Sequence, residues 1–137
     1  MAQLLETELG NQLFIIEAVD AGLLDKSNPK YAADLLNTIN SHTLGKLLTR
    51  LKAKSKSPDV LETLLSNALD ERNRLFHSFY REHNFRRNTD EGRDFMMDDL
   101  QSIHELLTKA YKAVMLLSGV DLDNVSQDVL PTRHVPI

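Results

Sequence analysis

The stretch SPDVLETLLSNALDERNRLFHSFYREH, residues 57–83, predicts the fold of this chain of 137 residues. It opens with Ser57 and Pro58, a capping residue followed by a proline at the first helical position, which is typical of a helix start. Apolar residues then recur every three or four positions, as on one face of a helix, except that Arg72 takes the position between Ala68 and Phe76. The apolar residues are Leu61, Leu65, Ala68, Phe76 and Phe79. A helix with such a stripe must bury it against neighbours, so we expect one helix over 57–83 inside a helical bundle.

The same spacing predicts four further helices on either side of this stretch. Their expected ranges are 4–21, 27–39, 43–54 and 88–119. Gly22 and Gly119 are expected to end the first and the last of them, and Asn88, with Glu91 three residues on, to cap the last. Short connections make successive helices antiparallel. We therefore predict an all-α, up-and-down bundle of about five helices over 1–119, followed by a C-terminal tail over 120–137.

The composition excludes several classes of site. The chain has no cysteine, which excludes disulfides, cysteine-ligated metals and a cysteine nucleophile. The five histidines show no metal-ligand spacing such as H-E-x-x-H, so we expect no metal and no cofactor. A basic leader followed by an apolar segment is missing, as is an apolar run of bilayer length, so we expect a cytoplasmic protein without membrane contact.

Charge is unevenly distributed along a chain whose net charge is −4. Residues 46–56 carry five cations and no acid, and residues 72–93 carry six arginines against three acids, whereas the remainder is strongly acidic. Such asymmetry permits a local anionic partner such as RNA on an acidic protein. The alternative interpretation is that these are solvated helix faces that happen to be basic.

Arg72 is the anomaly of the sequence because it shares a helix face with the apolar stripe. A buried charge needs a partner, and the simplest interpretation is an ion pair with a carboxylate of a neighbouring helix. The candidates are Glu17, Asp20, Asp98 and Asp99. Asn73 and His77 lie one turn apart on the adjoining face. Arginine binds phosphate oxygens and histidine exchanges protons near neutral pH, so the three together would suit RNA cleavage by the ribose 2′-hydroxyl without a metal.

Residues 72–77, RNRLFH, resemble the R-N-x-x-x-H form of the Arg-x4-6-His motif of HEPN domains. The surrounding ALDERNRLFHSFYREHNFRRNTDEGRDFMMDDL, residues 68–100, and the upstream TLGKLLTRL, residues 43–51, are similar to a bacterial HEPN-like group. The resemblance covers roughly residues 43–110. It implies a small helical bundle that forms a homodimer and works without a metal. In some members a tyrosine follows the histidine by two positions, where this chain has Phe79, and its nearest phenol is Tyr80.

The resemblance leaves two functions open. In catalytic members the matching residues form a ribonuclease site across the dimer interface, with Arg72 as the phosphate contact, Asn73 as the polar neighbour and His77 as the acid–base group. The expected RNA contacts around them are Arg74, Tyr80, Arg81, Arg86 and Arg87. The chain would then be an endoribonuclease of the toxin or phage-defence kind. Many HEPN-like proteins are inactive, and the alternative is a non-catalytic immunity, antitoxin or adaptor module that binds a protein.

Overall fold

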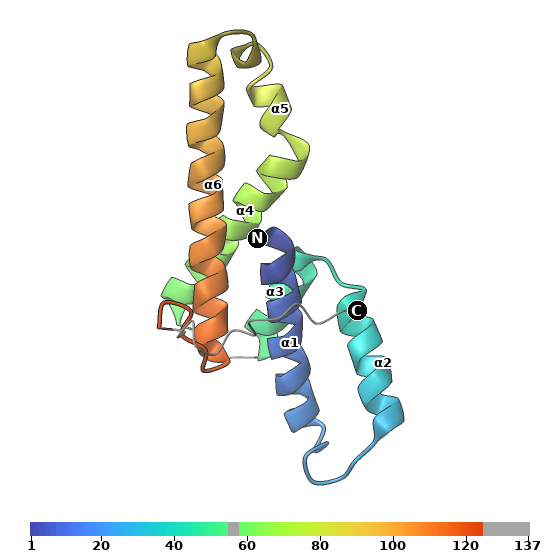
Figure 1. Ribbon diagram of the computed structural model, residues 1–137. Helices are drawn as coiled ribbons and strands as arrows, with labels where there is room; N and C mark the ends of the chain where they lie inside the picture. Colours follow the sequence, from blue (N-terminus) through green and yellow to red (C-terminus); the bar gives the residue numbers. More distant parts are fainter. Residues whose placement is uncertain (55–57, 125–137) are drawn as a thin grey trace, which may run out of the picture.

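The chain folds into a helical bundle in the computed structural model, which describes residues 1–54 and 58–124. The helices are α1 (Ala2–Asp20), α2 (Pro29–Asn40), α3 (Leu44–Lys54), α4 (Asp59–His77), α5 (Phe79–Glu82) and α6 (Asp90–Leu117), with a 3-10 turn, η1 (Arg86–Asn88), before α6. Figure 1 shows α1 antiparallel to α2 and α4 antiparallel to α6. The prediction of an all-α bundle of about five helices is confirmed. Most of the expected tail, 125–137, lies outside the described residues.

Two glycines lie at the ends of α1 and α6, as predicted from the sequence. Gly22 and Gly119 have φ of 70° and 77°, a left-handed conformation that costs little only for a residue without Cβ. After α1, the amide of Leu23 donates to the carbonyl of Ala18, and after α6 the amide of Val120 donates to the carbonyl of Met115. These bonds satisfy carbonyls that the helix itself leaves unpaired. Both predicted stops are therefore confirmed.

The helix starts agree less uniformly with the sequence. Asn28 caps α2, since its side chain accepts a hydrogen bond from the amide of Tyr31 at 3.1 Å, as expected from the Asn-Pro pair. The predicted cap of the last helix, Asn88, is wrong by one residue. Thr89 is the cap, because its hydroxyl accepts from the amide of Gly92 at 3.0 Å. Asn88 belongs instead to the turn η1, which occupies the approach to α6.

The predicted fourth helix is broken. Regular α4 ends at His77, and Ser78 departs from helical geometry with φ −127° and ψ −22° before the short α5. Phe76, before the break, is 62% exposed, whereas Phe79, beyond it, is buried. The expectation that one straight apolar stripe continues past Arg72 is therefore wrong, because Phe76 faces solvent and the chain changes direction at Ser78.

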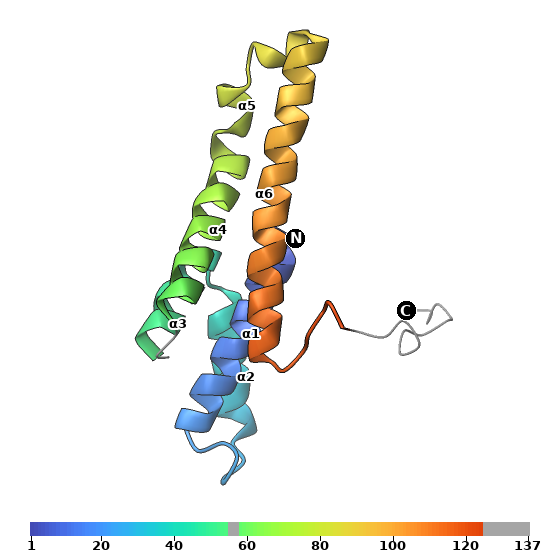
Figure 2. The ribbon, with the colours of Figure 1, turned by 90° about the vertical axis from the view of Figure 1, so that its left-hand side faces the viewer.

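The main apolar core is formed by α1, α3, α4 and α6, with Phe79 of α5, and a smaller cluster joins α2 to α1 and α3. The buried residues of α6 lie from its midpoint onward, at Ile103, Leu107, Ala110 and Val114. Met96 and Leu100, nearer its start, are only partly buried against the core. Figures 1 and 2 show the N-terminal half of α6 extending past α1, alongside α4, α5 and η1. No described helix is both long and apolar enough to cross a bilayer.

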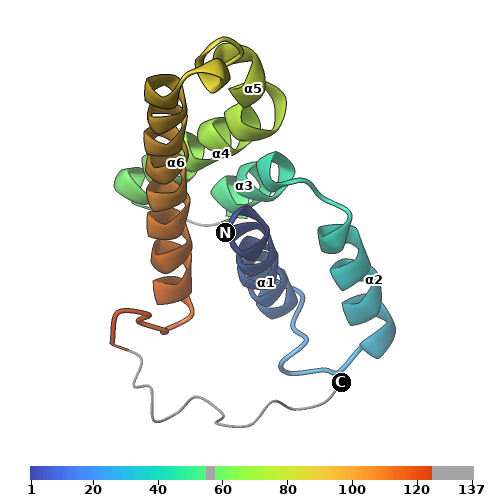
Figure 3. The same ribbon diagram turned by 45° about the horizontal axis from the view of Figure 1, so that its top comes forward.

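Gly92 brings the first turn of α6 against the backbone of η1. A Cβ at this position would lie 1.9 Å from the carbonyl oxygen of Arg86, which no rearrangement of a side chain relieves because the contact is with backbone. Figure 3 shows this corner from above, where the chain turns from α5 through η1 into α6. The close approach fixes η1 relative to α6.

Replacement of Gly92 by alanine should therefore unfold this corner. We expect Gly92→Ala to lower the free energy of unfolding by about 3 kcal/mol, the range of an overpacked site. Gly45 in α3 is the matched control, because its Cβ would meet Leu69 at an ordinary 3.7 Å. Gly45→Ala should be neutral or stabilising by up to about 1 kcal/mol. Urea unfolding followed by circular dichroism measures both, and equal stability of the two variants would contradict the packing described.

Candidate functional site

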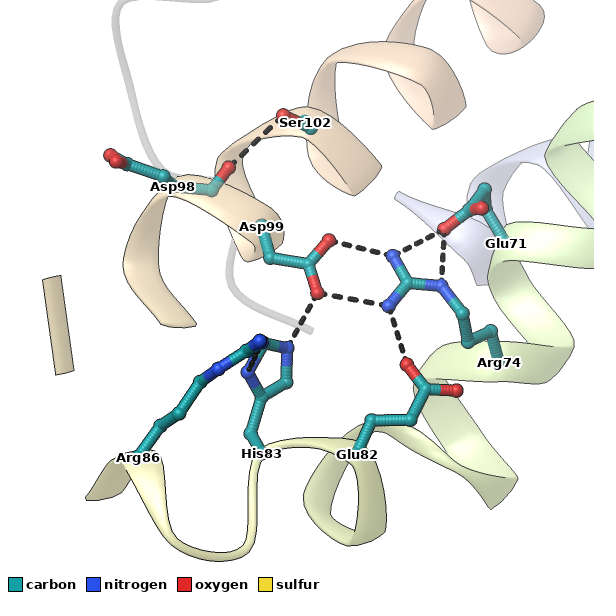
Figure 4. Close-up of polar contacts among 8 residues, drawn as sticks. All are labelled: Glu71, Arg74, Glu82, His83, Arg86, Asp98, Asp99 and Ser102. Carbon is teal, nitrogen blue, oxygen red and sulfur yellow. Dashed lines mark hydrogen bonds and ion pairs between the residues drawn. The ribbon is translucent and has the colours of Figure 1, made fainter. Parts of the chain in front are cut away.

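An ionic cluster around Asp99 joins α4, α5 and α6 at the edge of the apolar core. The Asp99 carboxylate on α6 accepts hydrogen bonds from Nη1 and Nη2 of Arg74 on α4, at 2.9 and 2.7 Å. Its Oδ2 also lies 2.6 Å from Nε2 of His83, the residue that follows α5. Figure 4 shows the three side chains converging from their separate elements. We call these residues, with Glu71, Glu82 and Arg86 around them, the Asp99 cluster.

Arg74 is surrounded by carboxylates. Besides Asp99, its guanidinium donates to Glu71 at 2.9 Å and to Glu82 at 3.0 Å. The hydrogen bonds from Arg74 hold the pKa of the Asp99 carboxyl well below its usual range, despite partial burial, and His83 acts in the same direction. The same contacts, Asp99 first and Glu71 next, raise the pKa of Arg74 above its ordinary value. Arg74 is therefore a charged side chain that links α4 to α6 and has carboxylate partners on every side.

His83 is almost completely buried, with 2% of its surface exposed. Its Nδ1 lies 3.1 Å from Nη1 of Arg86, and its ring packs on Phe79 with centroids 4.5 Å apart. Arginine has only donors, so Nδ1 must be the acceptor and Nε2 must carry the proton that points at Asp99. Both ring nitrogens of His83 are thus occupied. His83 is therefore placed to hold the cluster together.

The sequence analysis missed this cluster and misassigned the carboxylates. Asp99 was one expected partner of Arg72, but it pairs with Arg74, and Glu17 pairs with Arg50 on α3. The predicted ion pair of Arg72 is therefore wrong within the described residues. Arg74 itself was expected to contact RNA, and in this structure three carboxylates occupy its guanidinium.

Arg72 has neutral neighbours instead. Its Nη1 donates to Oδ1 of Asn73 at 3.1 Å, and its guanidinium carbon lies 4.8 Å from the centroid of the Phe76 ring. The side chain is half-buried, and across residues 1–54 and 58–124 no carboxylate forms an ion pair with it. A cation held by an amide and an aromatic face keeps its charge uncompensated. Arg72 is thus open to an anion in a way that Arg74 is not.

His77 is exposed at the last position of α4. In the described part of the chain its ring makes no hydrogen bond, while its carbonyl accepts one from Arg81 at 3.3 Å. The structure thus brings Arg72 and Asn73 into contact and places Arg81 beside His77. Among the described residues, no side-chain hydrogen bond joins His77 to Arg72 or Asn73.

The other predicted RNA contacts lie beyond the break in α4. Tyr80 is 77% exposed and meets Phe79 edge-on, and Arg86 lies over the Phe95 ring at 4.3 Å. Some arginines of the described residues have no ion pair, and we call them the unpaired arginines. They are Arg72, Arg81, Arg86 and Arg87. All four fall between the last turns of α4 and η1, and in the described residues of α6 beside them Glu91, Asp94 and Asp98 also form no ion pair.

Comparisons with known proteins add no relative. No family model, no curated protein and no solved structure matches the chain. The resemblance to HEPN domains therefore depends on the residues of the motif and its surroundings.

Among the described residues, no group of three or more histidine, aspartate or glutamate side chains is placed to hold a metal ion.

Loss of the Asp99 carboxylate should destabilise the fold. We expect Asp99→Asn to lower the free energy of unfolding by about 2 kcal/mol, because Arg74 and His83 lose a charged acceptor. Asp98→Asn is the matched control. The Asp98 side chain is exposed and points away from the cluster in Figure 4, so its replacement should change stability by less than about 0.5 kcal/mol. Equal unfolding midpoints in urea would contradict the role assigned to Asp99.

The same carboxylate should make stability depend on acid pH. Its pKa is lower in the folded protein than in the unfolded chain, so the unfolded state binds the proton more readily. The contribution of Asp99 is complete above about pH 5 and is lost as the pH falls through about 4 towards the folded-state pKa. Urea unfolding at pH 6, 5, 4 and 3 should therefore bring wild type and Asp99→Asn together as the pH falls. A constant gap between them would contradict the linkage, and Asp98→Asn should follow wild type.

Proposed function

We propose that this chain is a cytoplasmic, metal-independent endoribonuclease of the HEPN type, of the toxin or phage-defence kind, that acts through Arg72, Asn73 and His77. One observation carries the proposal: two arginines two positions apart have opposite surroundings. Arg74 is enclosed by three carboxylates, whereas Arg72 rests on Asn73 and Phe76 and has no carboxylate partner among the described residues. An arginine kept free of acids, with an exposed histidine five positions on at the end of the same helix, suits a phosphate ligand.

The chemistry follows from these side chains. His77 accepts the proton of a ribose 2′-hydroxyl, the 2′-oxygen bonds to the adjacent phosphorus, and the bond from phosphorus to the 5′-oxygen breaks. Arg72, oriented by Asn73, stabilises the negative charge that builds on the non-bridging oxygens. The departing 5′-oxygen takes a proton from water or from His77 of a second copy. The products are a 2′,3′-cyclic phosphate and a 5′-hydroxyl, and no step requires a metal.

A homodimer is part of this proposal. A single α4 supplies one histidine, and a second copy would supply the other acid–base group. Phe76, which supports the Arg72 guanidinium, is 62% exposed, and an exposed aromatic beside the motif is a suitable contact for a second chain.

The alternative, a non-catalytic module that binds a protein, is favoured by another observation. α1 exposes three aliphatic side chains, Leu4, Ile15 and Val19, whose spacing places them on one helix face. An apolar face of this kind suits a protein partner. This face lies on α1, whereas the motif lies on α4. Substitutions on α1 should therefore affect a protein-binding function, and substitutions on α4 should affect RNA cleavage.

Cleavage of RNA by the purified protein in EDTA tests the proposal. We expect wild type to convert a labelled single-stranded RNA into fragments that end in a cyclic phosphate. His77→Ala should lower the rate about 10²- to 10⁴-fold, the usual contribution of a general base. Arg72→Ala should lower it about 10²- to 10³-fold, as expected for loss of a charge-stabilising donor.

The control is His104→Ala, which removes an exposed histidine from α6 and should leave the rate unchanged. Circular dichroism of each variant excludes unfolding as the cause of a loss. An inactive wild type, or activity that survives His77→Ala, would contradict the ribonuclease and favour the protein-binding alternative.

A further inference from the structure

A pocket of about 340 Å³ lies where η1 meets the first turns of α6. It is lined by Phe85, Arg86, Thr89, Glu91, Gly92 and Phe95. We propose that this pocket stacks one unpaired base of a single-stranded RNA, at a position away from the cleaved bond. The inference rests on the proposed function for its ligand class and adds a second binding site, which would hold the strand while the motif acts on it.

The aromatic walls provide the stacking surface. Phe85 is 85% exposed and Phe95 is 57% exposed, an unusual amount of uncovered aromatic surface for one pocket. The guanidinium carbon of Arg86 lies 4.3 Å from the centroid of the Phe95 ring. Bases of single-stranded RNA stack on aromatic rings and on guanidinium planes, and this pocket offers both.

The pocket is held in shape before any ligand arrives. Arg86 is fixed by its hydrogen bond to His83, and His83 is fixed by Asp99. On the other side, Gly92 packs against the backbone of Arg86, and the amide of Gly92 donates to the hydroxyl of Thr89. A rigid site loses little conformational entropy when it binds, so the buried network contributes to affinity without touching the ligand.

Two arginines at the pocket suit the backbone of a nucleic-acid strand. Arg86 and Arg87 are unpaired arginines, and a phosphodiester backbone that passes them would compensate both. Glu91 lines the same pocket, where a carboxylate suits the exocyclic amino group of cytosine or adenine rather than a phosphate. A paired base is already stacked on both faces, so the pocket should discriminate against duplex.

Fluorescence can report the stacking directly. The chain contains no tryptophan, so Phe85→Trp creates a single reporter in the wall of the pocket. We would make it in full-length His77→Ala protein, which leaves the RNA uncut, and titrate it with a ten-nucleotide oligocytidylate. Stacking should quench the tryptophan, whereas an abasic strand with the same number of phosphates should not. Leu24→Trp, at an 81% exposed site between α1 and α2, is the control and should not respond.

Affinity provides the second measurement. In the His77→Ala protein, Phe85→Ala should weaken binding of fluorescein-labelled oligocytidylate about 5- to 150-fold, the loss expected for one base–aromatic stack. Leu24→Ala should change it less than about twofold. Phe85 is too exposed for its truncation to affect folding, so a loss of affinity reports the contact itself.

Several results would overturn the inference. They are an equal response to the abasic strand, an affinity that Phe85→Ala leaves unchanged, or a Phe85→Ala protein that changes its oligomeric state in sedimentation but not its RNA affinity. The last result would assign the aromatics to a protein contact. The proposed ribonuclease stands or falls separately, because quenching by oligocytidylate with an inactive wild type would retain the pocket and remove the catalysis.

Discussion

The carboxylate of Asp99 is the constraint on which the functional end of the molecule depends. The N-terminal half of α6 is mostly only partly buried against the apolar core, and Asp99 joins it to α4 through Arg74 and to the end of α5 through His83. An ion pair that is hydrogen-bonded on both sides adds to the apolar packing there. The position of η1, and with it the pocket beside α6, follows from this tie.

The same interaction divides the arginines into those with and those without an ion pair. Arg74 pairs with the acids around it, including Glu71 and Glu82, so Arg72 and the arginines of η1 have no acidic partner among the described residues. Arg74, which has a structural role, and Arg72, which is proposed to be functional, thus lie two positions apart on α4. The Asp99 carboxylate pairs with Arg74 because of the way α4 and α6 are packed. The acidic balance of the chain as a whole is therefore compatible with individual arginines that remain free to bind an anion.

Much of the fold could be predicted from the sequence because its signals are local. Apolar spacing defines the helices, and Gly22 and Gly119 mark their ends through backbone conformation alone. The break at Ser78 could not be predicted, because the residues on both sides of it keep helical spacing. The choice of Arg74 over Arg72 by Asp99 depends on how α4 is rotated against α6, a tertiary quantity that spacing within one helix does not contain.

The hydrogen-bonded chain Arg74–Asp99–His83–Arg86 also constrains how this protein can change over time. Each member satisfies another, so loss of any one leaves a partly buried donor or charge without its partner. Substitutions within such a set are strongly non-additive. The four positions should therefore co-vary among homologous sequences. Relatives of this chain would keep all four residues, or replace them together with apolar residues that pack the same space.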